Sequence, residues 1–250
     1  MTNIFKNQRE YLKTMLFCDN AEKYLDNIIA LEKESFTDED IVSFVYEQRN
    51  KNVQCWALLK LNYINNEKDA EFIVSLLNDT RSSLRELVSE LIERQFNCNK
   101  ENLRLLFDKI SYYPTFTSTL KDINPRVTRN LTNCYKHFNY KNDLFKCLYT
   151  SMTMEKGPFV QFWGLEGINE IFAELNHSEI EKYFPDLLKY IDKLLMGQDD
   201  LLKEKSLLLL NNFVKFINTN IDKRLTKTIL KMQSCNNPYI KDLATKIDFD

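Results

Sequence analysis

Apolar residues recur along this chain at helical spacing, in segments that open with an aliphatic residue followed by a polar or basic one. The position four residues after each aliphatic residue is often small. Because residues four apart lie on one face of a helix, each segment predicts an amphipathic helix with one buried stripe. The six segments are Val53-Gln54 with Ala57, Leu84-Arg85 with Val88, Val127-Thr128 with Leu131, Val160-Gln161 with Gly164, Leu202-Lys203 with Ser206, and Ile240-Lys241 with Ala244.

Turn and capping residues precede most of these segments, as at Asn124-Pro125, Gly157-Pro158 and Asn237-Pro238. Proline is tolerated just inside a helix start, because the N–H that it lacks has no helical partner there. The segments recur about every 31 to 43 residues, which is the length of a helical hairpin. Partner helices are therefore expected between them, over about residues 38–50, 67–78, 100–112, 142–153, 179–196 and 221–233.

Thr37 precedes Asp38, Glu39 and Asp40, which predicts a helix start with a hydroxyl cap and favourable acidic charge. Residues 1–35 are expected to add two further helices with a break near Asp19-Asn20.

The composition favours the same fold class, because the 250 residues include 4 glycines and 5 prolines. Sandwiches, barrels and doubly wound sheets need turn residues at most strand ends, and phosphate-binding loops need glycines at fixed spacing. This chain has too few of either, so an all-α protein is predicted.

The six segments resemble the second helices of the HEAT-repeat family, in which an aliphatic residue, an adjacent Arg or Lys and a small residue four places on recur in each hairpin. Arg85, Lys203 and Lys241 match the basic position, whereas Gln54, Thr128 and Gln161 do not. The resemblance implies an α-α superhelix, a HEAT/armadillo-like solenoid of about six hairpins. Residues 1–36 would be an N-terminal helical cap, and residues 37–250 one continuous solenoid domain. An irregular helical bundle is the alternative.

The net charge and the short apolar runs argue against nucleic-acid binding and against a membrane-spanning helix. Lys and Arg number 34 against 36 Asp and Glu, giving a net charge of −2, whereas a nucleic-acid domain usually carries a basic excess. The longest apolar run, Cys55 to Leu59, is far too short to span a membrane. The first ten residues lack the features of a secretory signal, so a cytoplasmic location is expected. The six cysteines form no CxxC pair and are expected to be reduced, mostly as core thiols.

No catalytic, cofactor-binding or metal-binding constellation is predicted. The two histidines, His137 and His177, leave few options for a hydrolytic triad, and no GxSxG turn exists. Cys134 and His137 stand three apart on one predicted helix, but structural zinc needs four ligands and no second pair is near. A core cysteine beside a surface histidine is the preferred interpretation.

The segment 158–175 carries the most unusual side chains of the chain. A helical projection places Val160, Gly164, Ile168, Ile171 and Leu175 on one stripe, which predicts the core face. Large aromatic and acidic residues lie off this stripe, and exposed apolar patches often mark binding sites. The sequence leaves open whether a neighbouring helix covers them. This group consists of Phe159, Phe162, Trp163, Glu166 and Glu170.

If the second helices line the concave side, as in HEAT solenoids, their outward residues would form one strip. The third repeat would offer Arg126, Arg129 and Lys136, the fourth the aromatic and acidic group, and neighbouring repeats acidic or mixed charges. Such alternating charge fits a protein or peptide better than a polyphosphate. The plainer interpretation is a solvated helix face with ordinary intrahelical ion pairs.

These observations predict a non-catalytic scaffold or adaptor that binds a protein or peptide partner on its concave surface. The alternative is a HEAT-like DNA-binding protein resembling the alkylpurine DNA glycosylases, in which Arg126, Arg129 and Lys136 would hold the phosphate backbone and Trp163 would lie near the lesion. No segment matches the catalytic motif of that family. A regulatory or chromophore-lyase-like subunit is neither favoured nor excluded.

Overall fold

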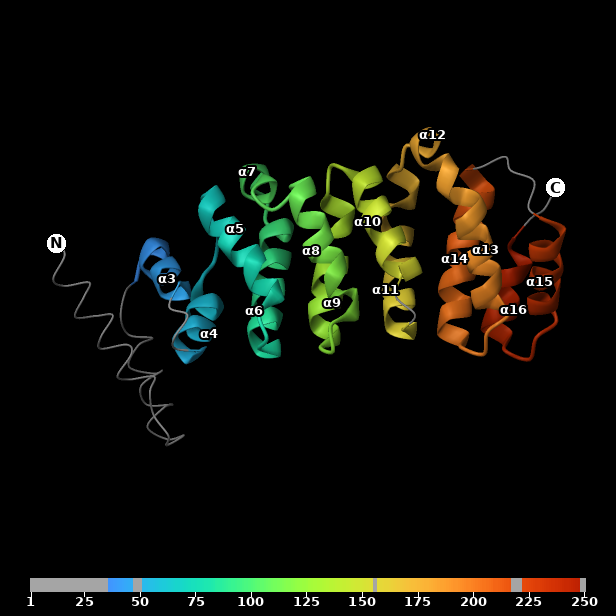
Figure 1. Cartoon of the computed structure of the whole chain (residues 1–250), viewed down its shortest axis with the longest axis horizontal. Coiled ribbons are helices and arrows are strands. Elements are labelled where there is room, and N and C mark those ends of the chain that lie inside the picture. Colours follow the sequence, from blue (N-terminus) through green and yellow to red (C-terminus); the bar gives the residue numbers. More distant parts are fainter. Residues whose placement is uncertain (1–35, 47–50, 155–156, 217–221, 248–250) are drawn as a thin grey trace, which may run out of the picture. The chain divides into compact units, whose positions relative to one another are not determined.

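The computed structural model describes residues 36–46, 51–154, 157–216 and 222–247, which form α-helices and short 3-10 helices with no β-strand among them (Figure 1). The chain divides into two compact units, Met1–Phe107 and Asp108–Asp250. The predicted cap over residues 1–36 lies, apart from Phe36, outside the described residues. The expectation of a single continuous domain over residues 37–250 stays a prediction.

The first unit contains two helical hairpins followed by a short helix. Thr37 caps the first helix as expected, because its hydroxyl accepts from the Asp40 N–H while the Asp40 carboxylate accepts from the Thr37 N–H. The second helices of the two hairpins, α4 and α6, pack against each other. The elements are α3 (Asp38–Val45), α4 (Lys51–Lys60), α5 (Glu67–Ser75), η1 (Leu76–Asn78), α6 (Ser82–Asn97) and α7 (Glu101–Leu105).

The second unit contains four hairpins whose helices stand side by side in chain order (Figure 1). The first helices include α8 (Tyr113–Ser118), α10 (Lys141–Met154), α13 (Phe184–Leu195) and α15 (Lys223–Gln233). The second helices are α9 (Pro125–Thr132), α11 (Pro158–Ile171), α14 (Asp200–Phe216) and α16 (Pro238–Thr245). Short elements connect or extend them: η2 (Ile110–Tyr112), η3 (Thr119–Lys121), η4 (Tyr135–His137), η5 (Phe172–Glu174), α12 (His177–Ile180) and η6 (Glu181–Tyr183).

Packing in the second unit runs between neighbours. Helix α11 contacts α9 on one side and α14 on the other, and α14 contacts α16 in turn. The first helices contact each other in the pairs α8–α10 and α13–α15. Each hairpin thus buries its apolar stripes against its own partner helix and the next hairpin, which is how helical repeats build a continuous core.

The predicted repeat pattern is confirmed at all six second helices, since each aliphatic anchor lies within one of them. The positions four residues after the anchors are all buried. They are Ala57, Val88, Leu131, Gly164, Ser206 and Ala244.

Two predicted first helices are wrong in their extent. The helix expected over 100–112 ends at Leu105, and the chain resumes helical structure at η2 and α8. Between them the buried Asp108 carboxylate accepts hydrogen bonds from the Tyr113 hydroxyl and from the Asn139 N–H, so residue 108 is held by tertiary contacts rather than by a helix. The helix expected over 179–196 is divided into α12, η6 and α13, because Pro185 starts α13 and cannot continue a preceding helix.

Gly164 serves a closer contact than the sequence suggests. Gly164 faces Met152 of α10, the partner helix within the same hairpin. A Cβ built at Gly164 would lie 2.8 Å from the Met152 Cβ. Real Cβ atoms do not approach so closely, so any side chain at this position would push α10 and α11 apart.

Gly164→Ala should therefore lower the free energy of unfolding by about 1–3 kcal/mol, the usual cost of overpacking a core, despite the better helix propensity of alanine. Chemical denaturation of the full chain measures this effect. Gly157→Ala is the matched control, because a Cβ at Gly157 comes no closer than 4.0 Å to Val160. Equal stability of the two variants would show that α10 and α11 do not pack as closely as described.

A hydrogen bond ties consecutive repeats through their first helices. The Tyr190 hydroxyl of α13 donates to the Met152 carbonyl of α10 at 3.0 Å. Burial raises the pKa of Tyr190 from its ordinary value of 10.0 to about 12. The neutral hydroxyl is thus favoured in the folded chain, and the contribution of Tyr190 to stability is complete below pH 10 and is lost as the pH rises from 10 towards 12.

Tyr190→Phe should lower the free energy of unfolding by about 1 kcal/mol at neutral pH, because the Met152 carbonyl loses its donor. Above pH 10 this deficit in the free energy of unfolding should shrink or reverse. The unmodified chain must then keep Tyr190 protonated in order to fold, whereas phenylalanine has no proton to lose. Urea denaturation between pH 7 and pH 11 measures the difference. Tyr239→Phe is the control, because it removes the hydroxyl of an exposed ring. It should change neither the free energy of unfolding at neutral pH nor its dependence on pH. A deficit for Tyr190→Phe that is constant with pH would contradict this account.

Candidate binding surface

Helix α9 and the turn that follows it expose three predicted binding residues to solvent. Asn124 caps the helix by accepting from the Arg126 N–H, and one face is buried through Val127 and Leu131. Arg126 and Arg129 lie on the opposite, exposed side. Lys136 is exposed in η4, the turn that follows the helix. The three predicted cations are therefore all exposed, two on α9 and one in the turn that follows it.

The predicted core stripe of α11 is confirmed, and its aromatic and acidic group divides into two parts. Val160, Gly164, Ile168, Ile171 and Leu175 are all buried. In the group off this stripe, Phe159 remains 55% exposed at the start of the helix and Glu170 is exposed near its end. The others are half-buried, namely Phe162, Trp163 and Glu166.

The half-buried part contacts the next repeat. The Lys205 ammonium of α14 lies 2.7 Å from the Glu166 carboxylate and 5.3 Å from the centre of the Phe162 ring. The Trp163 ring meets the Phe162 ring edge to face at 5.2 Å between centroids. Glu166 and Phe162 are therefore used, at least in part, to hold Lys205 between two hairpins.

The indole of Trp163 offers no polar group to a ligand. Its N–H is buried and has no hydrogen-bond acceptor in the described chain. The role predicted for Trp163 therefore rests on its ring face alone.

Two asparagines extend the contact between α11 and α14. The Asn169 side chain donates to the Lys205 carbonyl, and the Asn212 side chain donates to the Asn169 side-chain oxygen, each at 3.3 Å. Both asparagines are half-buried. The sequence analysis did not connect them, because the pairing depends on which helices become neighbours. Their alignment fixes the register of the two helices beside the exposed Glu170.

The core-thiol prediction is confirmed at Cys134 and wrong at the four other described cysteines, and the prediction of a surface histidine is wrong at His137. Cys134 is fully buried and its thiol donates to the Asn130 carbonyl at 3.2 Å, while His137 is half-buried. Cys55, Cys98, Cys147 and Cys235 are half-buried rather than core residues, and Cys18 lies outside the described residues. Among the described residues, no three His, Cys, Asp or Glu side chains are grouped as metal ligands would be.

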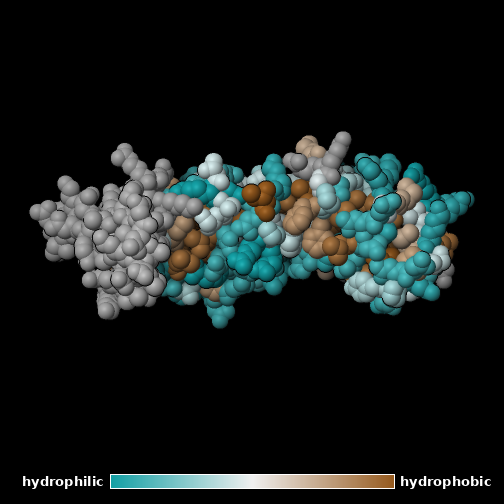
Figure 2. Space-filling model, turned by 90° about the horizontal axis from the view of Figure 1, so that it is seen from below, coloured by the Kyte–Doolittle hydropathy of each residue, from teal (hydrophilic) through white to brown (hydrophobic). Residues whose placement is uncertain are grey.

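A row of exposed apolar side chains follows one edge of the second unit, and apart from Phe159 none of the residues in this row is among the predicted binding residues. Every hairpin of the second unit carries at least one such side chain, in or beside the turn between its first and second helix. Figure 2 looks onto this edge, where hydrophobic patches interrupt a mostly hydrophilic surface. Four of them lie in the first or last turn of a helix, and their exposure depends on whether a neighbouring hairpin covers them, which the pattern within one helix does not specify. The residues of the row are Ile123, Met154, Phe159, Met196, Leu201 and Tyr239.

None of the helices in the described ranges has both the length and the apolar character needed to cross a bilayer.

Comparisons with known proteins establish the fold class. No protein-family model and no curated protein matches the sequence. Among solved structures, an engineered protein aligns with a TM-score of 0.59 at 14% identity, covering 85% of this chain and 97% of its own. A computationally designed armadillo repeat protein for modular peptide recognition aligns at 0.57 and 16% identity, covering 84% and 98%. Another designed armadillo repeat protein, in complex with the peptide (KR)4, aligns at 0.59 and 16%, covering 85% and 98%.

These similarities, together with the helix order, define the chain as an all-α solenoid of HEAT/armadillo-like repeats, as the sequence predicted.

The ion pair between Glu166 and Lys205 should couple the two repeats. A double-mutant cycle with Glu166→Gln and Lys205→Met should give a coupling of about 0.5–1 kcal/mol in the free energy of unfolding, because both side chains are more buried than ordinary surface pairs. The same cycle on Asp186 and Lys189, a pair exposed on α13, should give a smaller coupling. A Glu166–Lys205 coupling no larger than this control would mean that Glu166 remains available to a partner.

Proposed function

We propose that the chain is a non-catalytic scaffold that binds a peptide or an extended segment of a partner protein on the face formed by its second helices. In the second unit this face comprises α9, α11 and α14. The observation that carries the proposal is the charge arrangement on adjacent helices. Exposed Arg126, Arg129 and Lys136 lie on and just after α9, and exposed Glu170 lies on the neighbouring α11.

Opposite charges on adjacent helices fit a partner whose own charges change sign along its length. Acidic residues of the partner would lie over α9 and basic residues near Glu170. Such complementarity increases association rates and discriminates against partners with the wrong charge order. A uniformly anionic polymer would meet Glu170 unfavourably, whereas Glu166 is already paired with Lys205.

The exposed Phe159 ring adds an apolar contact at the start of α11. It lies about 16 Å from Glu170 along the helix, from the 1.5 Å rise per residue. A partner that engages both residues would therefore run along α11. Aromatic residues are frequent among those that dominate binding energy. The structural similarity to a designed armadillo repeat protein in complex with (KR)4 supports peptide binding by this kind of fold.

The test is a selection of binders from a random dodecapeptide display library, followed by affinity measurements with charge-reversed scaffolds. Peptides that bind the unmodified chain should lose at least tenfold in affinity for Arg126→Glu with Arg129→Glu, because two attractive contacts become repulsive. Replacing the acidic residues of the peptide by lysine should restore binding to that variant. Lys189→Glu, on the first-helix layer, is the control and should bind normally.

Selected peptides that bind all variants equally would overturn the proposal. Duplex DNA, the alternative predicted from the sequence, is included as a further probe at physiological salt. Micromolar, salt-sensitive DNA binding that is abolished by Arg126→Glu with Arg129→Glu would replace the peptide proposal.

A further inference from the structure

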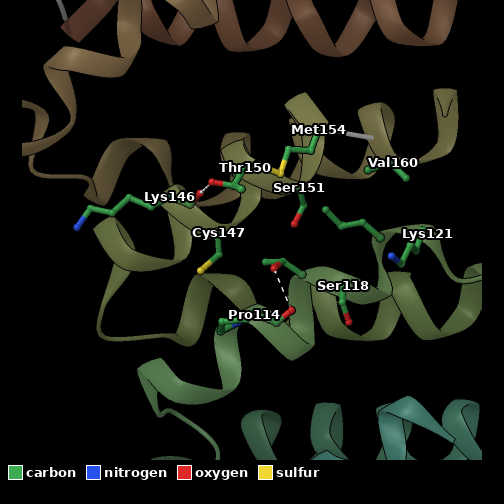
Figure 3. Close-up of a pocket in the computed structure, with 11 residues that line it drawn as sticks. Pro114, Ser118, Lys121, Lys146, Cys147, Thr150, Ser151, Met154 and Val160 are labelled. Atoms are coloured by element: carbon green, nitrogen blue, oxygen red, sulfur yellow. Dashed lines mark hydrogen bonds between the residues drawn. The ribbon is translucent and has the colours of Figure 1, made fainter. Parts of the chain in front are cut away.

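A pocket of about 390 Å³ opens between the first helices of two consecutive hairpins (Figure 3). Its walls come from α8, η3 and α10, with one residue from the start of α11. The volume lies within the range of ordinary ligand sites. The sequence gives no indication of this pocket, because the pocket depends on how α8 and α10 pack.

The walls are largely apolar. Pro114, Leu120, Met154 and Val160 contribute carbon and sulfur surface. Several hydroxyls line the pocket, but they are bonded within their own helices: Thr117 donates to the Tyr113 carbonyl, Ser118 to the Thr115 carbonyl and Thr150 to the Lys146 carbonyl. These hydroxyls already have acceptors, so an occupant of the pocket need not accept a hydrogen bond from them.

Two groups inside the pocket remain for a ligand. The Ser151 hydroxyl makes no hydrogen bond within the described chain, and Figure 3 shows it directed across the pocket towards α8. Cys147 also lines the pocket, and burial raises the pKa of its thiol, so it is neutral and weakly polar at neutral pH. An occupant would therefore meet one free hydroxyl in otherwise apolar surroundings.

The charge of the lining has one sign. Lys121 and Lys146 are part of it, and none of its residues is acidic. Asp143, one turn before Lys146 on α10, lies 3.0 Å from the Lys146 ammonium and offsets part of its charge. Lys121 lies at the opposite end of the pocket from Lys146 (Figure 3). An apolar group flanked by carboxylates would complement the apolar walls and the cationic ends, in addition to the interactions that both lysines already make.

The apolar surface continues beyond the pocket. Met154 lines the pocket and is also 77% exposed, so its side chain extends the apolar contact to the outer surface. A compact small molecule would leave this surface uncovered. A polypeptide segment would cover it with the residues that follow the inserted side chain.

We infer that the pocket between α8 and α10 receives a large apolar side chain from an acidic segment of a partner protein, at a site separate from the second-helix face. Lys121 and Lys146 bind the flanking carboxylates, and Met154 covers the neighbouring residue of the segment. This site needs no part of α9 or of Glu170, so its occupancy is independent of the peptide-binding function proposed above.

The test uses three synthetic octapeptides and the methionine methyl groups of the full chain as reporters. One peptide carries two leucines among glutamates, the second carries the leucines among lysines, and the third carries serines among glutamates. Chemical shifts of ¹³C-labelled methionine methyls are followed to about 2 mM peptide, which detects even weak binding. Met154 reports on the pocket, and Met196, exposed at 53% in another hairpin, is the internal control.

The leucine–glutamate peptide should shift the Met154 methyl saturably and leave Met196 unchanged. The leucine–lysine peptide should bind at least tenfold more weakly, and the serine–glutamate peptide should give no saturable shift. Lys121→Glu with Lys146→Glu should invert the preference between the two leucine peptides. Lys189→Glu is the matched control, because Lys189 forms the same three-residue-spaced ion pair with Asp186 as Lys146 forms with Asp143.

Three results would each overturn the inference: no shift of Met154 with any peptide, equal binding of the two leucine peptides, or equal shifts of Met154 and Met196. Because Arg126→Glu with Arg129→Glu leaves the pocket intact, that variant should bind the leucine–glutamate peptide normally. Loss of binding there would assign the peptide to the second-helix face instead.

Discussion

The close approach of α11 to its partner helix is the contact on which the second unit depends. Gly164 leaves room for Met152 of α10, and Gly167 leaves room for Tyr135 and Leu148, with a Cβ at Gly167 lying only 3.0 Å from the Tyr135 ring. Two glycines three residues apart let one helix settle deeply between its hairpin partner and the preceding repeat. Since α11 also contacts α9 and α14, its depth sets the spacing of the layer of second helices.

This depth explains which side chains of α11 remain available. Seated deeply, the helix presents Phe162 and Glu166 to Lys205 of the next repeat, where they become half-buried. Only the two ends of the helix, at Phe159 and Glu170, clear the neighbouring hairpins. The residues that could meet a partner are those left over by repeat packing, so the surface is a consequence of the core.

Local signals made much of the fold predictable. The starts of α9, α11 and α16 follow from proline at the first turn, helped at Asn124 and Asn237 by side-chain caps, and all of these are visible in the sequence. The break before α8 was not predictable. It depends on hydrogen bonds that Asp108 accepts from the Tyr113 hydroxyl and from the N–H of Asn139, which lies 31 residues beyond Asp108 in the chain. The break at Pro185 had a local signal that the helix periodicity concealed.

The sequence predicts which side chains of α11 point away from the core, but not which of them remain exposed. A helical projection of α11 separates the core stripe correctly from the remaining residues, because that separation depends only on the helix period. It contains no information about Lys205, whose helix is brought alongside by the stacking of hairpins. The pocket between α8 and α10 and the apolar turn residues depend in the same way on neighbours that the pattern within one helix does not specify.

The two layers of a helical hairpin stack give it two faces that need not share a partner. In the second unit, the second-helix face carries cations on and just after α9 beside Glu170 on α11, whereas the α8–α10 pocket has an apolar lining with lysines and no acid. Between them lies the packed interface of α10 and α11, where Met152 and Gly164 leave no room for rearrangement. The two surfaces therefore differ in chemistry and belong mainly to different helix layers, although Met154 of the pocket and Phe159 of the second-helix face flank the same turn.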